Sequence, residues 1–361
     1  MNGRQRETGF GLRRAFTMVE LMVAVVLSVI VVVGLYALFF SQSRAFLLQD
    51  LQQSMNQNAR FGADVLSRSG RMAGYGTGGS TDGALGWDGS SSSNGDSFPA
   101  VISWDAWDTS YETDAVTFLY ADPAVEMMTD GGVLEDCSAS EISFDVDDAD
   151  NATALEQYAT GELLICWDYA SLVGTDSWMW VINADGDGTA GTIGVASNAA
   201  YTDYTNSCDG NLPPIMHCSR ANLVTFYIDN TDNGTGPGSP EHPVLMMDLD
   251  FDFADGTPDA DDIPLVDDIE DLQIEYCLEG TDCTDDTVWV DDVTLTEGMS
   301  VWMMRYTVVA RSRKEDTQAI HLMQPPSIAN ANRSGEAEDY FWRRAITTSV
   351  TFANLRVMYA P

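Results

Sequence analysis

The first strong pattern in the chain is an apolar run from Phe16 to Phe40 in which Glu20 is the only charged residue. About 20 apolar residues in a helix are enough to cross a bilayer, so this run predicts a transmembrane helix. Arg13 and Arg14 precede it, and because basic residues stay on the cytoplasmic side, we expect the bulk of the chain outside. A cleaved secretory signal has a shorter apolar core and a small-residue cleavage site, and no such site follows Phe40. The segment is therefore expected to be retained as an anchor.

The helical pattern changes after the apolar run but does not stop. Between Leu48 and Leu66, apolar and small residues recur every three or four positions, while polar residues fill the other face. No proline occurs before Pro99, so nothing forces the helix to break early. One helix is predicted from Phe16 to Met72, roughly 85 Å long at 1.5 Å per residue. Its second half is amphipathic and should pack against a globular domain.

The remainder of the chain has the pattern of a β-rich domain. Residues 74–95 are rich in glycine and serine and predict a surface loop. Alternating apolar and polar residues then indicate strands, and no second helix as long as the first is evident. The predicted strands cover residues 115–120, 162–168, 178–183, 223–228, 244–253, 269–277, 287–290, 301–312 and 346–355. The expected fold class is α+β, with a long N-terminal transmembrane and amphipathic helix packed on an antiparallel β-rich domain.

The charge of the chain is strongly negative and unevenly spread. There are 56 acidic and 17 basic residues, for a net charge of -39, and residues 76–304 contain a single base, Arg220. Such a chain repels phosphate backbones, so direct nucleic-acid binding is not expected. Hydrophobic residues make up 45% of the chain, which is enough for a packed core. The main cations near the C-terminus are predicted to form ion pairs: Arg311, Arg313, Arg343 and Arg344.

The cysteines predict disulfide bonds in an exported domain. The six are Cys137, Cys166, Cys208, Cys218, Cys277 and Cys283. Their number is even and no zinc-type CxxC pair occurs, so disulfides are favoured over a metal site or six buried thiols in a cytosolic core. Six cysteines allow 15 pairings. Turn-rich sequences between neighbours favour Cys208 with Cys218 and Cys277 with Cys283, which leaves Cys137 with Cys166.

The start of the apolar run carries a family resemblance. The sequence Ala15-Phe16-Thr17-Met18-Val19-Glu20-Leu21 resembles the class III signal of type IV prepilins, whose usual form is Gly-Phe-Thr-Leu-Ile/Val-Glu-Leu. The resemblance implies that a membrane-bound prepilin peptidase cuts between Ala15 and Phe16 and methylates the new N-terminus. Residues 1–15 would then be a leader, residues 16–72 the helix with its membrane span at about 16–40, and residues 73–361 the exported domain. Ala15 stands where this family usually has glycine.

The carboxylate of Glu20 needs a partner because of its position in the span. A charged residue inside a membrane helix costs on the order of 2.5 to 3.5 kcal/mol on lenient insertion scales. After cleavage, Glu20 would be the fifth residue of the mature chain, and the new Phe16 amine of an incoming subunit could pair with it. The alternative is an acid that snorkels to the cytoplasmic interface, one helical turn away. The surrounding signal favours an assembly role for Glu20.

Later segments resemble PilW-type minor pilins. The matching stretches are Arg60-Phe61, Leu66 to Arg68, Arg71 to Tyr75, Val266 to Tyr276, Val308 to Arg313, Arg343 to Ala345, Thr347 to Val350 and Asn354 to Arg356. The resemblance implies a minor type IV pilin that primes pilus assembly within a minor-pilin tip complex and supports twitching, adhesion or DNA uptake. The alternatives are a minor pseudopilin of a type II secretion system and a pilin-anchored, calcium-dependent surface-binding module.

The resemblance also implies partners and a location. Expected partners are the prepilin peptidase, other minor pilins, the major pilin, the assembly machinery of the inner membrane and a tip adhesin. The chain would cross the inner membrane once with a periplasmic C-terminal domain, and would later be part of the pilus on the cell surface.

One segment has the spacing of a calcium loop. Asn183, Asp185 and Asp187 occupy the first, third and fifth positions and a glycine the sixth, but Gly194 stands where such a loop has its bidentate glutamate. Asp248, Asp250 and Asp252 form a second acidic cluster that could attract a divalent cation. The alternative is a solvated acidic surface suited to a saline habitat, because the acidity extends over the whole middle region.

Catalysis has little support in the sequence. The three histidines, His217, His242 and His321, belong to no HExxH motif, and no GxSxG, phosphate-binding loop or dinucleotide-binding fingerprint is evident. The acids are too numerous for one pair to be singled out as general acid and base. A non-enzymatic protein is therefore expected.

Overall fold

The protein is described from a computed structural model. It describes residues 17–76, 101–108, 113–122, 124, 127–129, 141–144, 153–168, 177–187, 192–196, 216–230, 242–249, 262–278, 280–291, 301–313, 315–316, 323, 325–326, 328 and 339–352. The chain divides into two compact units, Met1–Gln53 and Ser54–Pro361. Helix α1 contributes residues to both units, and the leader, helix and domain bounds expected from the sequence stay a prediction.

Helix α1 runs from Met18 to Met72 and ends at the residue predicted for it. Gly74 follows with a φ of 79°, the left-handed conformation that glycine adopts most easily just after a helix. The Ala73 amide donates to the Ser69 carbonyl oxygen at 3.0 Å, and the Tyr75 amide donates to that of Met72 at 2.9 Å. These bonds satisfy carbonyl groups of the last turn and direct the chain away from the helix axis.

Thirteen strands follow the helix in the described part of the chain. They are β1 Val101–Asp108, β2 Thr113–Ala121, β3 Met127–Met128, β4 Glu141–Ser143, β5 Leu163–Asp168, β6 Ser177–Asp187, β7 Thr192–Ala196, β8 Met216–Asp229, β9 Val244–Asp248, β10 Ile263–Asp267, β11 Ile269–Leu278, β12 Val301–Arg311 and β13 Arg343–Thr351. The first ten form one sheet in the order β1-β2-β8-β5-β6-β7-β4, with β3 and β9 also on β8 and β10 on β9, and the last three form a second sheet. All the strand pairs are antiparallel, which confirms the predicted α+β class.

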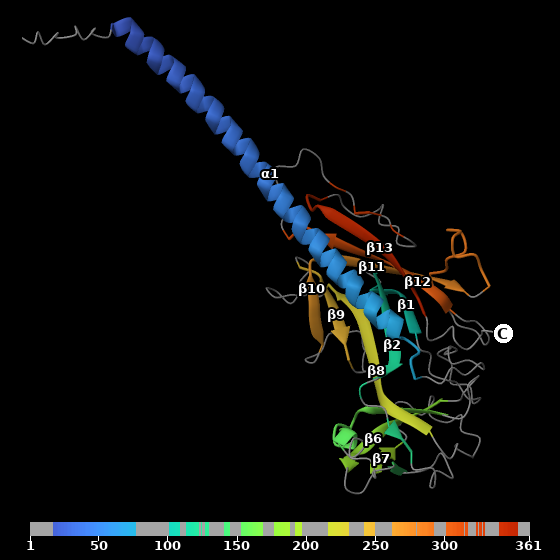
Figure 1. Cartoon of the computed structure of the whole chain (residues 1–361). Helices are drawn as coiled ribbons and strands as arrows, with labels where there is room; N and C mark the ends of the chain where they lie inside the picture. The colour runs from blue at the N-terminus through green and yellow to red at the C-terminus, as the bar shows by residue number, and fades with distance from the viewer. Residues whose placement is uncertain are drawn as a thin grey trace, which may run out of the picture. The chain divides into compact units, whose positions relative to one another are not determined.

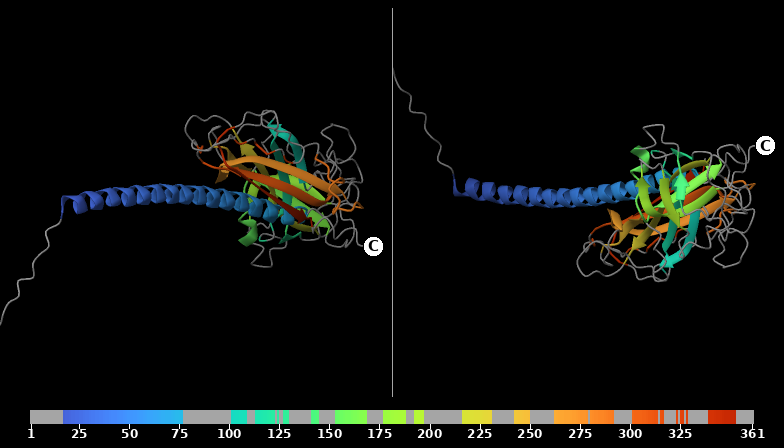
Figure 2. Two further views of the ribbon diagram at one scale, coloured as in Figure 1. Left: turned by 90° about the horizontal axis from the view of Figure 1, so that it is seen from above. Right: turned by 90° about the horizontal axis from the view of Figure 1, so that it is seen from below.

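Within the second unit, the C-terminal part of α1 packs on the sheets through small residues. Its buried face consists of Met55, Ala59, Gly62, Ala63, Leu66 and Gly70. A Cβ atom on Gly62 would lie 3.3 Å from Leu245 Cδ2, and one on Gly70 would lie 3.1 Å from Val350 Cγ1. Glycine therefore allows the helix backbone to approach β9 and β13. Figure 2 shows the orange and red strands of the three-stranded sheet beside this part of the helix.

A buried tyrosine fixes the helix to the three-stranded sheet. Tyr306 on β12 is fully buried. Its hydroxyl group donates to the Ala63 carbonyl oxygen at 2.7 Å and also contacts the Ser67 hydroxyl group. The buried hydroxyl group of Tyr306 thus has a hydrogen-bond partner on the helix backbone, as buried hydroxyl groups require.

Strand β8 is shared by two hydrophobic cores. Its second half pairs with β2 and β9, and its side chains Val224, Phe226 and Ile228 join the core formed with α1 and β11–β13. Its first half pairs with β5 and β3, and Cys218 belongs to a separate core with residues such as Leu164 and Ile182. In Figure 1 the long yellow β8 extends from the helix-covered sheets toward β6 and β7. We call the part between β2 and the middle of β8, residues 122–220, the inserted lobe.

Eight of the nine predicted strands are found, with changed ends. The exception is the segment 287–290, which forms turns apart from a single bridge between Val290 and Tyr276. Strands β1, β3, β4, β7 and β10 were not predicted from the sequence. The loop predicted at 74–95 lies mainly outside the described residues.

Candidate functional site

The first turn of α1 holds Glu20 in a reciprocal cap with Thr17. The Thr17 amide and hydroxyl groups donate to Glu20 Oε2 at 2.9 and 3.0 Å. In return, the Glu20 amide donates to Thr17 Oγ1 at 3.2 Å. This is a capping box, in which a threonine and a glutamate three residues later satisfy the free amides at a helix start. The Thr-x-x-Glu spacing is visible in the sequence and is the local signal for this cap.

The cap fixes the carboxylate at the start of the apolar helix. An acid in this position is also favoured by the positive end of the helix dipole. Both capping oxygens belong to residues just after the expected cleavage point. Ala15 and Phe16 lie outside the described residues, so their processing remains a prediction here.

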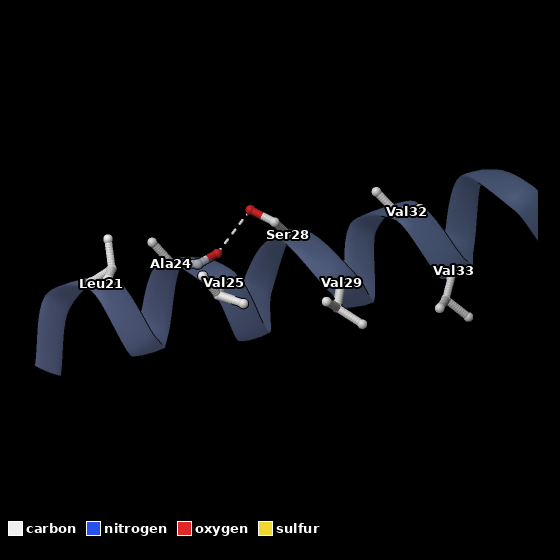
Figure 3. Close-up of a pocket in the computed structure, with 7 residues that line it drawn as sticks. All are labelled: Leu21, Ala24, Val25, Ser28, Val29, Val32 and Val33. Atoms are coloured by element: carbon white, nitrogen blue, oxygen red, sulfur yellow. Dashed lines mark hydrogen bonds between the residues drawn. The ribbon is translucent and has the colours of Figure 1, made fainter. Parts of the chain in front are cut away.

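The apolar part of α1 is exposed throughout the described structure. From Met18 to Phe40 its large apolar side chains are 53 to 80% exposed, and the helix is long and apolar enough to cross a membrane. A shallow hollow lies along this part of the helix, and Figure 3 draws the residues that line it. The hollow is lined by Leu21, Ala24, Val25, Ser28, Val29, Val32 and Val33. Ser28 donates its hydroxyl hydrogen to the Ala24 carbonyl oxygen at 2.8 Å, so the one polar side chain in the hollow is satisfied within the helix.

The disulfides differ from the predicted pairing. Cys166 and Cys218 lie directly opposite each other on β5 and β8, and they form a disulfide with a Cα–Cα distance of 4.0 Å. The predicted bonds of Cys218 with Cys208 and of Cys166 with Cys137 are therefore wrong. The reasoning from short loops failed because strand pairing, which brings together residues 52 positions apart, cannot be seen in local turn sequences.

The second predicted disulfide is confirmed. Cys277 at the end of β11 is bonded to Cys283, with a Cα–Cα distance of 5.8 Å. The turn between them includes Gly280, which has a φ of 82°, so a residue without Cβ suits this short loop. Cys137 and Cys208 lie outside the described residues.

The residues of the predicted calcium loop lie in strand β6. This strand runs from Ser177 to Asp187 and therefore contains Asn183 as well. The Asp185 carboxylate accepts hydrogen bonds from the Thr160 hydroxyl and amide groups at 2.6 and 2.8 Å, and these bonds lower the pKa of Asp185. In the described part of the chain, no group of three or more His, Cys, Asp or Glu residues is arranged to hold a metal ion. A calcium site at these residues remains a prediction.

Gly186 has a packing role beside these residues. A Cβ atom at this position would lie 1.9 Å from the Leu155 carbonyl oxygen, and the Gly186 amide donates to the Tyr158 carbonyl oxygen at 3.1 Å. The backbone of β6 thus touches the turn at residues 155–158. The absence of a side chain at Gly186 allows this close contact between two backbone segments.

The second acidic cluster is only partly described. Asp248 is buried at the end of β9, and Asp250 and Asp252 lie outside the described residues. Nearby, the Tyr227 hydroxyl group donates to Asp262 Oδ2 at 2.7 Å. Burial, together with this carboxylate, raises the pKa of Tyr227. Tyr227 is therefore held in its neutral form as a hydrogen-bond donor to Asp262.

Arg343 forms the predicted ion pairs at the start of β13. Its guanidinium group binds both oxygens of Glu270, at 2.6 and 3.0 Å, and both oxygens of Asp339, at 2.7 and 2.5 Å. Burial opposes its charge, but these bonds outweigh it and raise the pKa of Arg343. Such bidentate geometry makes strong pairs. The pairs tie the first residues of β11 and β13 together.

The other predicted cations behave differently. The Arg311 guanidinium group lies 4.6 Å from the centre of the Phe341 ring, and burial lowers the pKa of Arg311. Arg313 and Arg344 are exposed. Among the described residues no ion pair of Arg313 or Arg344 is seen, so for these two arginines the expected pairing stays a prediction.

Two further ion-pair centres were not predicted from the sequence. Arg305 binds Glu275 at 2.8 Å and Asp286 at 2.8 Å, and its guanidinium group lies 4.5 Å from the centre of the Trp289 ring. These contacts hold the loop that follows the Cys277–Cys283 disulfide against β12. Their partners lie on different strands and turns, so sequence spacing gave no signal for them.

Arg220 is the second of these centres. It binds Asp122 at 2.8 Å and Glu162 at 3.2 Å, so the one base of the acidic middle region joins the end of β2 to the turn before β5. The pKa of Arg220 is raised, first by its bond to Asp122. The pair sits where the inserted lobe meets the rest of the second unit.

Comparison with known proteins identifies the N-terminal segment. Residues 11–36 match the family model described as the prokaryotic N-terminal methylation motif. No curated protein matches the chain. Among solved structures, the chain is similar to the type IV-like pilin TTHA1219 from Thermus thermophilus, at 14% identity over 57% of this chain and 92% of that chain, with a TM-score of 0.22.

The matched motif agrees with the geometry of the helix start. It contains Thr17 and Glu20 and includes most of the apolar run. A methylation motif of this kind implies processing by a prepilin peptidase, and the exposed apolar helix is consistent with anchoring in a membrane. The N-terminal segment of the chain thus carries a prokaryotic N-terminal methylation motif at the start of a long, exposed apolar helix.

Proposed function

We propose that this protein is a minor type IV pilin that primes pilus assembly within a minor-pilin complex at the filament tip. The observation that carries the proposal is the capped Glu20 carboxylate at the start of an exposed apolar helix, inside a methylation motif. An acid in this place is expensive in a membrane unless it meets a positive partner. Cleavage before Phe16 would create such a partner in every subunit.

The geometry of the cap suits this pairing. Both Thr17 donors bind the same oxygen, Oε2, so Glu20 Oε1 retains lone pairs for a further donor. The charged amine of Phe16 in an incoming subunit is a donor of the right kind. Pairing would neutralise two charges in a medium of low dielectric constant, where their attraction is strong. It would also fix the axial step between neighbouring helices.

The minor-pilin assignment has support from the second sheet. The stretches that resemble PilW-type proteins contribute to β11, β12 and β13, which pack together against α1. Under this proposal, residues 1–15 are the leader, and the chain crosses the inner membrane once, with residues 73–361 in the periplasm. Disulfide bonds fit that compartment, because it is oxidising. Its partners would be other minor pilins, the major pilin and the inner-membrane assembly machinery.

The proposal is tested by two measurements, the N-terminus of the mature chain and the recovery of variants in filaments. Sheared surface filaments are analysed by mass spectrometry, and the chain should be present with methylated Phe16 as its first residue. Glu20→Ala should insert into the membrane normally, because a polar cost is removed, yet it should be recovered much less in filaments or in complexes with other minor pilins. Ser28→Ala, in the same apolar segment, is the matched control and should assemble normally.

Two results would contradict the proposal. The first is a mature chain that starts at Met1 or beyond Phe40, because neither has the required amine next to the cap. The second is full recovery of Glu20→Ala in complexes with other minor pilins. Recovery only with components of a secretion system would favour a pseudopilin instead.

A further inference from the structure

Strand β13 has one edge that no described strand covers. It pairs with β12 alone among the described strands, in a register without a shift. Just beyond its two ends, the Ser312 amide donates to the Trp342 carbonyl oxygen at 2.7 Å, and the Phe352 amide donates to that of Trp302 at 3.2 Å. In an antiparallel ladder, residues that bond to the partner strand alternate with residues that do not. The even-numbered residues of β13 therefore bond to β12, and the odd-numbered residues present their amide and carbonyl groups on the opposite side.

This opposite side is exposed and suits a further strand. Its central residues are Ala345, Thr347 and Ser349, and all three are exposed. We call their backbone groups the free edge. The segment from Ala345 to Thr351 has no charge and no proline, and five of its seven residues are β-branched, which favours an extended backbone. An added strand could bond to the amide and carbonyl groups of all three residues.

The larger sheet has an edge of a different kind at β10. Strand β10 also pairs with a single described strand, β9. It contains Pro264, which has no amide hydrogen, and its register shifts between Pro264 and Val266. Proline and bulges are features that keep an edge strand from pairing with another chain. Strand β13 has neither feature, so its free edge is a regular template for strand addition.

The charges around β13 favour an acidic partner. Residues 340–361 contain three arginines and no acid. Arg343 is held by Glu270 and Asp339, whereas Arg344 is exposed and forms no ion pair among the described residues. A carboxylate opposite Arg344 on an added strand would form a cross-strand ion pair. The net charge of the chain is screened beyond about 8 Å at physiological ionic strength, so this local arginine decides the preference.

We infer that the free edge of β13 is a docking site for an extended acidic segment of another protein, which adds to the three-stranded sheet as a fourth, antiparallel strand. Backbone hydrogen bonds supply the affinity, as in other cases of strand addition. The pair between Arg344 and a carboxylate sets the register of the added strand. A second copy of β13 fits this edge less well, because it brings arginines and no acid to the contact. The inference does not rest on a priming role for the chain.

The test measures binding of labelled peptides to the full-length chain in neutral detergent micelles by fluorescence anisotropy. The acidic probe has the sequence Thr-Val-Thr-Val-Thr-Glu. Its glutamate lies opposite Arg344 when its first, third and fifth residues pair with Ser349, Thr347 and Ala345. Its second and fourth amide nitrogens are methylated, which blocks aggregation of the peptide but leaves the amides that face β13 intact. The matched control peptide is methylated at the third and fifth amide nitrogens instead, and it should not bind, because it lacks two of the donors to the free edge.

Two further measurements test the charge preference and the place of binding. Arg344→Glu should weaken binding of the acidic probe about fivefold at low salt and strengthen binding of a probe that ends in lysine, because the cross-strand pair changes sign. Arg313→Glu makes the same change at an exposed arginine outside β13 and should alter neither affinity. Hydrogen exchange should show that the amides of Ala345, Thr347 and Ser349 become protected when the acidic probe binds.

Four results would overturn the inference. Equal binding of the two methylated peptides would show that the backbone of β13 is not used, and so would unchanged exchange at the free edge. Equal effects of Arg344→Glu and Arg313→Glu would remove the case for an acidic partner. Self-association of the chain that Thr347→Pro abolishes would identify a second copy as the occupant. Glu20→Ala tests the proposed function separately, since it leaves β13 intact.

Discussion

Loss of the Cys166–Cys218 disulfide should destabilise the inserted lobe more than any other disulfide change in the described structure. Both cysteines are fully buried, and they join neighbouring strands of the lobe core. The perturbation is the double variant Cys166→Ala with Cys218→Ala. It removes the cross-link while keeping small apolar side chains in a core that cannot easily accept larger ones.

The expected magnitude follows from the length of chain that the bond closes. The two cysteines are 52 residues apart, and the chain-entropy model then gives a loss of about 4 kcal/mol in the free energy of unfolding. For Cys277 and Cys283, which are 6 residues apart, the same model gives about 2 kcal/mol. The variant Cys277→Ala with Cys283→Ala is therefore the matched control.

The assay is urea unfolding of the full-length chain in neutral detergent, followed by tryptophan fluorescence. The lobe variant should unfold at a lower urea concentration than the control variant. The denatured state of the lobe variant lacks a large closed loop and should be more expanded. Its free energy of unfolding should therefore fall more steeply with urea concentration. Equal losses in the two variants would refute the chain-entropy argument. A peptide map with Cys218 joined to Cys208 would refute the pairing itself.

Three further predictions concern the helix contact, a backbone contact and calcium. Tyr306→Phe removes the hydroxyl group that binds the Ala63 carbonyl oxygen, so thermal unfolding should report a loss of about 1 to 2 kcal/mol, and an unchanged melting temperature would contradict this. Gly186→Ala places a methyl group against the Leu155 carbonyl oxygen, and it should lower the yield of folded protein through strain in the lobe. If β6 does bind calcium, millimolar calcium should raise the melting temperature more than magnesium does, because calcium tolerates irregular oxygen cages. Asp185→Asn should abolish that difference, whereas an equal effect of both cations would indicate general screening.

The helix could be predicted well because its signals are local. An apolar run, a small-residue stripe and the absence of proline define it, and Gly74 marks its end. The signal for the capped Glu20 carboxylate is also local, because Thr17 and Glu20 are one helical turn apart. Strands such as β2 and β11 could also be predicted, because their apolar residues lie within a few positions of one another and turn residues bound them.

The strands that were predicted wrongly or not at all depend on interactions that a short stretch of sequence does not show. Strand β10 contains Pro264, which is tolerated because this strand pairs with β9 alone among the described strands and its register shifts at that point. Thr287 looked like the start of a strand, but its amide and hydroxyl groups both donate to Asp285 Oδ1, at 2.9 and 2.8 Å. This local bond competes with a strand ladder.

The pairing of β2 with β8 has a consequence for how the chain can vary. The last register pair of these strands is Ala121 with Ala221, so the chain leaves for the inserted lobe and returns from it at facing positions. Topologically, a hairpin turn could replace the whole lobe without changing the order of the remaining strands. The length and the surface residues of the inserted lobe can therefore change while the helix and the sheet that supports it keep their structure.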